Sequence, residues 1–177
     1  KTETENIRLS YPYDDSLEAG FLYQKIIKRT GALQIEILNF IPYNLAVEVM
    51  RIKIKNVSKK GVTLTPTSSI PLFGRSERNL RDHRHVTSLL NRIYLHKYGI
   101  FLKPTMVFDE KGHHINETHY FVLGFEGKKI APLGQYPSLD YFLGDGNLIS
   151  PDAIEKDIKP VKKDSPEFDG KEAIAAL

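Results

Sequence analysis

A period-two alternation of apolar and basic residues constrains this chain most. Three apolar residues alternate there with three basic ones: Met50, Arg51, Ile52, Lys53, Ile54 and Lys55. Successive side chains of an extended strand point to opposite faces, so the pattern predicts a strand with one dry and one wet face. Turn-forming residues 56–61 follow, and Val62 and Leu64 resume the extended pattern. We therefore expect a hairpin over residues 46–65.

Further strand-like segments recur at roughly ten-residue spacing. A second hairpin is predicted from residues 21–28 and 33–40, which flank Arg29-Thr30-Gly31 and end before Pro42. The remaining segments are a pair of strands over 87–95 and 100–108, a turn over 109–112 and a strand over 118–125. Strands that follow one another without intervening helices predict an all-β fold, a sandwich of antiparallel sheets.

The C-terminal third has a different pattern. Glycine, proline and charged residues dominate 127–172, which predicts a loop-rich region with short helical turns within 140–154 and a helix start at Ser150-Pro151. Residues 171–177 turn apolar again, and the chain begins with Lys1. We expect a single β-sandwich domain over 1–177 that is a fragment of a longer enzyme.

Composition excludes several classes of function. Cysteine is absent, which rules out disulfides, thiolate metal sites and cysteine nucleophiles and fits a cytoplasmic protein. The net charge is only +3, so we expect no nucleic-acid partner. No apolar run reaches the roughly 20 residues that span a bilayer, so no membrane association is predicted.

The densest cluster of polar and charged side chains lies just before the middle of the chain. Residues 75–92 contain five of the eight arginines and none of the seventeen lysines. Planar guanidinium groups suit forked hydrogen bonds to phosphate, carboxylate or polyols. The predicted substrate-binding, phosphate-binding or interface residues are Arg75, Arg78, Asn79, Arg81, Asp82, His83, Arg84 and His85.

Three roles remain open for this arginine cluster. Its cations are suitable hydrogen-bond donors to phosphate, and Asn79 and Asp82 are suitable hydrogen-bonding partners for sugar hydroxyls. Alternatively, the cluster contacts another domain or subunit, or pairs with its own acids to hold a long loop. The first two roles are the ones that we carry forward.

Metal binding and acid–base catalysis have weaker signals. His83 and His85 share one face of an extended segment, and His113, His114 and His119 are further donors, but no acidic ligand pattern accompanies them. We predict no metal, no cofactor and no catalytic residue. A mutarotase-like pairing of a buried Glu48 with His85 or His119 is the less favoured alternative.

The aromatic residues of the second half have two interpretations. The group comprises Tyr120, Phe121, Tyr136, Tyr141 and Phe142. Such residues more often form core than a platform for sugar rings. We expect a core role and retain the platform as the alternative.

Several segments in order resemble a known family. They are residues 40–58, 65–93, 108–118 and 141–154, which together span about residues 40–155. This set is similar to the N-terminal β-sandwich domain of glycoside phosphorylases of glycoside hydrolase family 94, formerly glycosyltransferase family 36, which includes cellobiose phosphorylase-like enzymes. The arginine- and histidine-rich insertion departs from that family, so the sugar is not carried over.

The resemblance implies an architecture and a role. It implies an antiparallel two-sheet super-sandwich of galactose mutarotase-like shape, followed by an α/α barrel that holds the catalytic acid. The barrel, a homodimer partner, and an oligosaccharide or sugar phosphate are the implied partners, and inorganic phosphate is the co-substrate of the parent enzyme. The chain alone is then an inactive accessory domain. A freestanding carbohydrate-binding module and a mutarotase-like epimerase are the alternatives.

Overall fold

The computed structural model describes residues 7–10, 15–74, 87–109 and 112–177, whose contacts group into two compact units. The first unit is Lys1–Thr65 and the second is Pro66–Leu177. All strand pairing is antiparallel, which confirms the predicted all-β fold with antiparallel sheets. The single domain over residues 1–177 stays a prediction.

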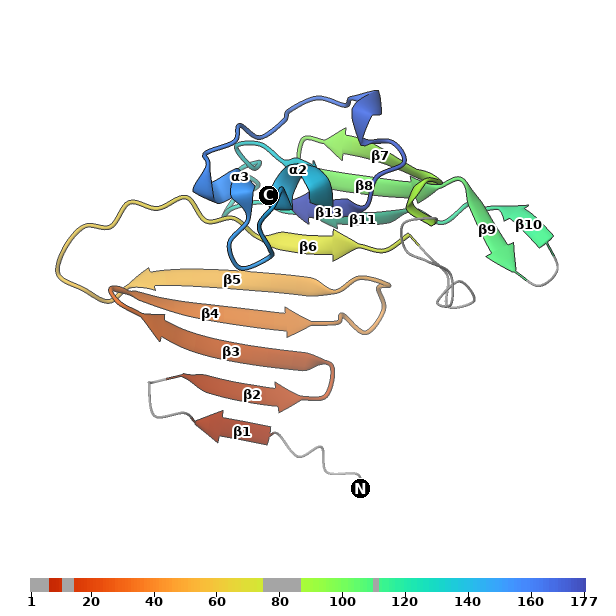
Figure 1. Ribbon diagram of the computed structural model, residues 1–177. Coiled ribbons are helices and arrows are strands. Elements are labelled where there is room, and N and C mark those ends of the chain that lie inside the picture. Colours follow the sequence, from red (N-terminus) through yellow and green to blue (C-terminus); the bar gives the residue numbers. More distant parts are fainter. Residues whose placement is uncertain (1–6, 11–14, 75–86, 110–111) are drawn as a thin grey trace, which may run out of the picture. The chain divides into compact units, whose positions relative to one another are not determined.

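The first unit is one five-stranded meander in which each strand pairs with the next along the chain (Figure 1). Its strands are β1 (Ile7–Ser10), β2 (Ser16–Gly20), β3 (Tyr23–Thr30), β4 (Leu33–Phe40) and β5 (Val49–Asn56). Gly31 reverses the chain between β3 and β4 with a φ of 54°, a conformation that glycine adopts readily. The hairpin expected from residues 21–28 and 33–40 is therefore confirmed.

The expected hairpin over residues 46–65 is only half correct. Its first strand is β5, but residues 61–68 form no strand. The Asn56 side chain instead stabilises a local turn over residues 56–60. Its Nδ2 donates to the Lys60 carbonyl oxygen (2.7 Å), and its Oδ1 accepts from the Ser58 N–H (2.9 Å). Asparagine favours such local side-chain bonds over strand pairing. The chain thus leaves the sheet without a return strand.

The two faces of this sheet differ as the period-two pattern predicts. One face carries a cross-strand isoleucine row of Ile26, Ile37 and Ile52. The other face carries two cross-strand ion pairs, Lys25–Glu18 (3.1 Å) and Arg51–Glu36 (3.2 Å). Ile52 and Ile54 nevertheless remain 42% and 37% exposed, so the face predicted to be dry is apolar but not buried.

The second unit contains two three-stranded sheets and a separate hairpin. One sheet has the order β12-β13-β6, from Tyr136–Ser138, Ala173–Ala176 and Ser69–Leu72. The other has the order β11-β8-β7, from Tyr120–Leu123, Gly99–Pro104 and Asn91–His96. The hairpin pairs β9 (Met106–Asp109) with β10 (Gly112–Ile115). Glu110 and Lys111, in the middle of the turn predicted over 109–112, lie outside the described residues.

Packing in the second unit builds a sandwich with helices on one side. A first core joins the two sheets: Ile93, Ile100, Leu102, Phe168, Ala173 and Ala175. A second core covers the other face of β13 with helices α2 (Leu139–Leu143) and α3 (Asp152–Glu155): Tyr136, Leu139, Phe142, Ala153, Ile174 and Ala176. The range predicted for helical turns, 140–154, overlaps both helices, each of which extends one residue beyond it. A 3-10 turn, η2 (Pro166–Phe168), follows. The galactose mutarotase-like super-sandwich stays a prediction.

The predicted strands 87–95 and 100–108 are confirmed as a pair but with different limits. β7 starts only at Asn91, because Thr87 and Ser88 begin a helical turn in which the Leu90 N–H donates to the Thr87 carbonyl oxygen (3.2 Å). The other strand divides into β8 and β9 at Thr105, whose N–H donates to the Leu90 carbonyl oxygen (2.9 Å) instead of continuing the β7 ladder. The chain then enters a different sheet.

A pair of isoleucines tests the second core. Ile174 is 0% exposed within it, whereas Ile149 is 96% exposed. We expect Ile174→Ala to lower the free energy of unfolding by about 2–5 kcal/mol, because it leaves a cavity. Ile149→Ala should change it by less than about 0.5 kcal/mol. Urea unfolding curves measure both, and equal losses would contradict the assigned core.

A pair of glycines tests the close approach of β8 to β11. A Cβ on Gly99 would lie 1.9 Å from the Val122 carbonyl oxygen, whereas a Cβ on Gly61 would meet nothing within 4 Å. Backbone cannot move aside cheaply, so Gly99→Ala should lower the midpoint of thermal unfolding markedly. Gly61→Ala should leave it unchanged or raise it slightly. A tolerated Gly99→Ala would show that these strands are not paired as described.

Candidate functional site

The predicted arginine cluster lies outside the described residues. This holds for all eight of its members: Arg75, Arg78, Asn79, Arg81, Asp82, His83, Arg84 and His85. Their sugar, phosphate or interface role stays a prediction. The structure does describe both ends from which this segment departs, at Gly74 and Thr87.

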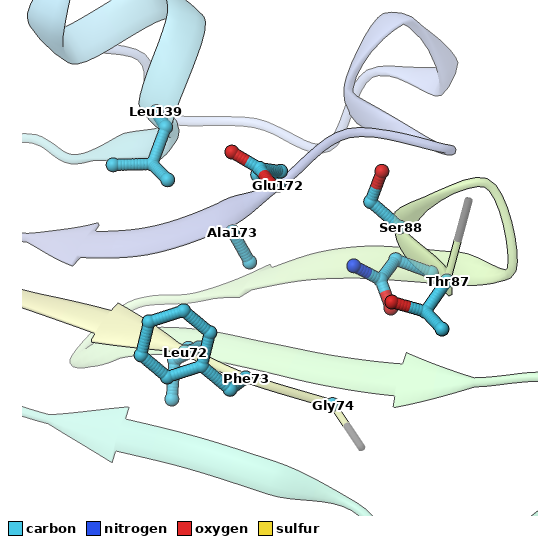
Figure 2. Close-up of a pocket in the computed structure, with 9 residues that line it drawn as sticks. Leu72, Phe73, Gly74, Thr87, Ser88, Leu139, Glu172 and Ala173 are labelled. Carbon is cyan, nitrogen blue, oxygen red and sulfur yellow. The ribbon is translucent and has the colours of Figure 1, made fainter. Parts of the chain in front are cut away.

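Both ends line one small pocket of the second unit (Figure 2). The lining residues come from the end of β6, the turn before β7, and the α2 and β13 segments: Leu72, Phe73, Gly74, Thr87, Ser88, Asn91, Leu139, Glu172 and Ala173. The cavity volume is about 20 Å³, which is room for about one water molecule. It is too small for a sugar ring, so we interpret it as the junction that holds the two ends together.

Close packing and buried hydrogen bonds hold these ends. A Cβ on Gly74 would lie 2.6 Å from Pro104 Cγ and 2.9 Å from Leu102 Cδ2, so this position accommodates only glycine without a shift. Asn91 is buried, and its Nδ2 donates to the Lys171 carbonyl oxygen (3.0 Å). Its own carbonyl oxygen accepts from the Gly170 N–H (2.9 Å). The arginine segment thus starts and ends on the rigid sandwich.

The aromatic group of the sequence analysis divides between core and surface. Tyr136 and Phe142 are buried, and Tyr141 and Tyr120 are half-buried against the two cores. Burial raises the pKa of the Tyr136 hydroxyl, which donates to the Ile158 carbonyl oxygen (2.7 Å). The core prediction therefore fits four of the five. Phe121 is the exception, at 47% exposed.

Phe121 belongs to a row of rings on the sheet formed by β7, β8 and β11. Its ring stacks on Phe101 with centroids 5.2 Å apart and an interplanar angle of 24°. The His96 ring meets Phe101 edge-on at 6.0 Å, and Tyr94 is the direct cross-strand neighbour of Phe101. We call Tyr94, His96, Phe101 and Phe121 the aromatic face. Only Phe121 was singled out from the sequence. The alternation of Tyr94 and His96 with Ile93 and Leu95 indicates that these two rings share a face.

Histidines and acids form no metal site in the described ranges. His113 and His114 lie on β10, and His119 is exposed before β11. No group of three His, Asp or Glu side chains that could hold a metal occurs among the residues that the structure describes. His83 and His85 lie outside them.

The carboxylates offer no recognisable general acid in the described part of the chain. Glu48 is exposed, whereas a mutarotase-like base would have to be buried. Asp140 pairs with Lys171 (3.2 Å), and Asp15 accepts a hydrogen bond from the Arg29 N–H (3.0 Å). Asp140 lies in the first turn of α2 and Asp15 directly precedes β2, and each bonds to a residue distant in the chain. These contacts are structural and give neither carboxylate the burial that a general acid needs.

Asp152 is a carboxylate whose pKa departs from its ordinary value. Its Oδ2 accepts from Lys156 Nζ (2.7 Å) and from the Asp145 N–H (3.1 Å). Both hydrogen bonds lower the pKa of the Asp152 carboxyl below its ordinary value of 3.8. The bond from Lys156 has the larger effect and the bond from the Asp145 N–H the smaller one. A lowered pKa suits a structural anion that closes the α2–α3 loop, and not an acid that must donate a proton.

Comparison with known proteins adds no assignment. No known family profile matches the chain, and no curated protein resembles it significantly. In the part of the chain that the structure describes, no helix is long and apolar enough to cross a bilayer. The function must therefore be argued from the residues themselves.

The Asp152 contacts predict a pH dependence of stability. A depressed carboxyl pKa stabilises the fold fully above the ordinary pKa of 3.8, and the contribution is lost as the pH falls through the depressed folded value. The Asp152→Asn variant should therefore unfold at a lower temperature than the parent chain at about pH 6. This difference in unfolding temperature should disappear towards about pH 2. Thermal unfolding across this range measures it. Glu117→Gln, at an exposed site, is the control, and a gap independent of pH would contradict the assignment.

Proposed function

We propose that this chain is a non-catalytic accessory domain of a glycoside phosphorylase-like, carbohydrate-active enzyme. In this proposal it supports the α/α catalytic barrel and a homodimer, in the cytoplasm. It presents the arginine cluster to a site that takes an oligosaccharide or sugar phosphate and inorganic phosphate. The barrel, and not this chain, supplies the carboxylic acid that protonates the leaving sugar oxygen.

The anchoring of the arginine segment carries this proposal. Its ends at Gly74 and Thr87 line one pocket and are held by the packed sandwich. Loops on rigid scaffolds are the usual position for binding residues. Arginine is suited to phosphate because its planar fork makes two parallel charge-assisted hydrogen bonds. The lack of a recognisable general acid among the described residues agrees with an accessory role.

A second candidate function is a freestanding carbohydrate-binding module. The observation that favours it is the aromatic face, because Phe121 is exposed on a rigid sheet. Aromatic rings with an uncovered face bind the apolar C–H face of a pyranose. A mutarotase-like epimerase has less support, since Glu48 is exposed.

Combined substitution of Arg78 and Arg81 by alanine, in the protein that includes the barrel, tests the accessory role. Loss of charge-assisted hydrogen bonds worth about 1.5–3 kcal/mol each should raise the KM for inorganic phosphate at least about tenfold. Phosphorolysis rates measured at varied phosphate concentration give this value. Arg51→Ala, which removes an exposed ion pair of the first unit, is the matched control.

Three outcomes separate the candidates. An unchanged KM for phosphate would reject the phosphate-contact role of the arginine cluster. Oligosaccharide binding by the chain alone, abolished by the same double substitution, would favour the freestanding module. Turnover of a pure sugar anomer by the chain alone would favour the epimerase.

A further inference from the structure

The outward side of the β11-β8-β7 sheet has an unusual composition. Its inward positions form the sandwich core through Ile93, Ile100 and Leu102. The alternate, outward positions carry aromatic, basic and one aliphatic side chain: Arg92, Tyr94, His96, Phe101, Lys103, Phe121 and Leu123. No Asp or Glu occupies an outward position of these three strands, all of whose residues the structure describes. This side therefore combines exposed rings with positive charge.

The rings of this side are held in place but remain accessible. Phe121 and Tyr94 are 47% and 46% exposed, and the stack of Phe121 on Phe101 fixes the ring orientation. β11 is the edge strand of its sheet, so no further strand of this sheet lies beside Phe121 (Figure 1). The ring face turned away from Phe101 is thus available for stacking.

The cations of this side lack full compensation. Arg92 and Lys103 lie directly opposite each other in the β7–β8 register, and like charges at opposite positions destabilise a sheet. Asp169 lies 3.7 Å from Arg92 Nε, and Arg92 Nη1 donates to the carbonyl oxygens of Asn91 (2.8 Å) and Leu89 (3.4 Å). These contacts compensate Arg92 in part and do not involve Lys103. Among the described residues, Lys103 has no ion-pair partner. An anion bound between Arg92 and Lys103 would relieve their repulsion.

We propose that this side of the sheet binds an acidic oligosaccharide, a short chain of hexuronic acid. A pyranose ring stacks on Phe121, and its carboxylate pairs with Lys103 and Arg92. Phe121 and Lys103 lie on either side of Phe101 on the same face of the sheet. Phe121 is the cross-strand partner of Phe101 on β11, and Lys103 follows Phe101 by two positions along β8. The two permanent cations of these outward positions only donate hydrogen bonds, and they gain more from a carboxylate than from the neutral hydroxyl groups of an uncharged glycan. This proposal rests on the proposed carbohydrate function and specifies its ligand.

The charge complementarity favours a uronic acid chain over single-stranded nucleic acid. A nucleic acid carries one phosphate per nucleotide and requires a long basic groove. The outward positions supply only two permanent cations, and the net charge of the chain is +3. Two cations on one sheet do not make the continuous basic groove that a nucleic-acid strand follows, whereas a short uronate oligomer needs only one or two carboxylate contacts.

The test uses the whole 177-residue chain and a tetramer of galacturonic acid. Calorimetry should detect binding that weakens at least about tenfold for the methyl-esterified tetramer, which keeps the rings but loses the charges. Phe121→Ala and Lys103→Ala should each weaken binding of the acidic tetramer about tenfold or more. Lys103→Ala should also reduce the weakening caused by salt, because it removes one charge contact.

Matched substitutions in the first unit control for general surface effects. Tyr43→Ala removes an exposed ring, and Lys55→Ala removes an exposed cation. Both should leave binding unchanged, and circular dichroism verifies that all variants fold. No binding by the folded chain, equal binding of the esterified tetramer, or tighter binding of single-stranded RNA would each overturn the proposal.

A failure of this inference can be distinguished from a failure of the proposed accessory role. Arg78 and Arg81 belong to none of the three strands β7, β8 and β11, so their substitution tests phosphorolysis and changes no residue of the aromatic face. Phe121→Ala should weaken uronate binding without changing the KM for phosphate. An unchanged KM for phosphate in the Arg78 and Arg81 variant would reject only the phosphate-contact role, whereas failure of the parent chain to bind the uronate tetramer would reject only this inference.

Discussion

The shared burial of β13 is the constraint on which the second unit depends. Ala173 and Ala175 face the opposing sheet, while Ile174 and Ala176 face the helices. Small side chains on both sides allow the layers to approach closely, so one strand of four residues takes part in two cores. It also lies between β12 and β6, so its backbone is paired along both edges.

The anchoring of the arginine segment follows from this arrangement. β6 pairs with β13, and the residues just before β13 accept and donate hydrogen bonds at Asn91. The start and the end of the segment are therefore tied to the same strand through different partners. Fixed ends reduce the conformational freedom that any segment between them would lose on binding a ligand.

The aromatic face depends on the same sandwich in a different way. Ile93, Ile100 and Leu102 point into the core, so the alternate residues of β7 and β8 must point outward. Their exposure is thus a consequence of core packing and not of local preference. The result is a combination of rings and cations on one side of the sheet, on which Tyr94 and Phe121 remain about half exposed.

Local chemistry accounts for the parts of the fold that the sequence predicted. The Gly31 turn, the strand β5 and the helix start near Pro151 each depend on neighbouring residues and were predicted correctly. The predicted return strand after Asn56 was wrong because the Asn56 side chain forms a local turn there. The predicted start of β7 was wrong because Thr87 and Ser88 begin a helical turn.

By itself, the sequence determined the antiparallel all-β class, most strand positions and the concentration of arginine at residues 75–92. Only the tertiary structure decided that Phe121 is a surface residue while Phe142 is core, and that Arg92 lies opposite Lys103. Periodicity reports which residues share a face, but the pairing partner and the burial of that face depend on residues far away in the chain. Those long-range contacts leave no signal in a local pattern.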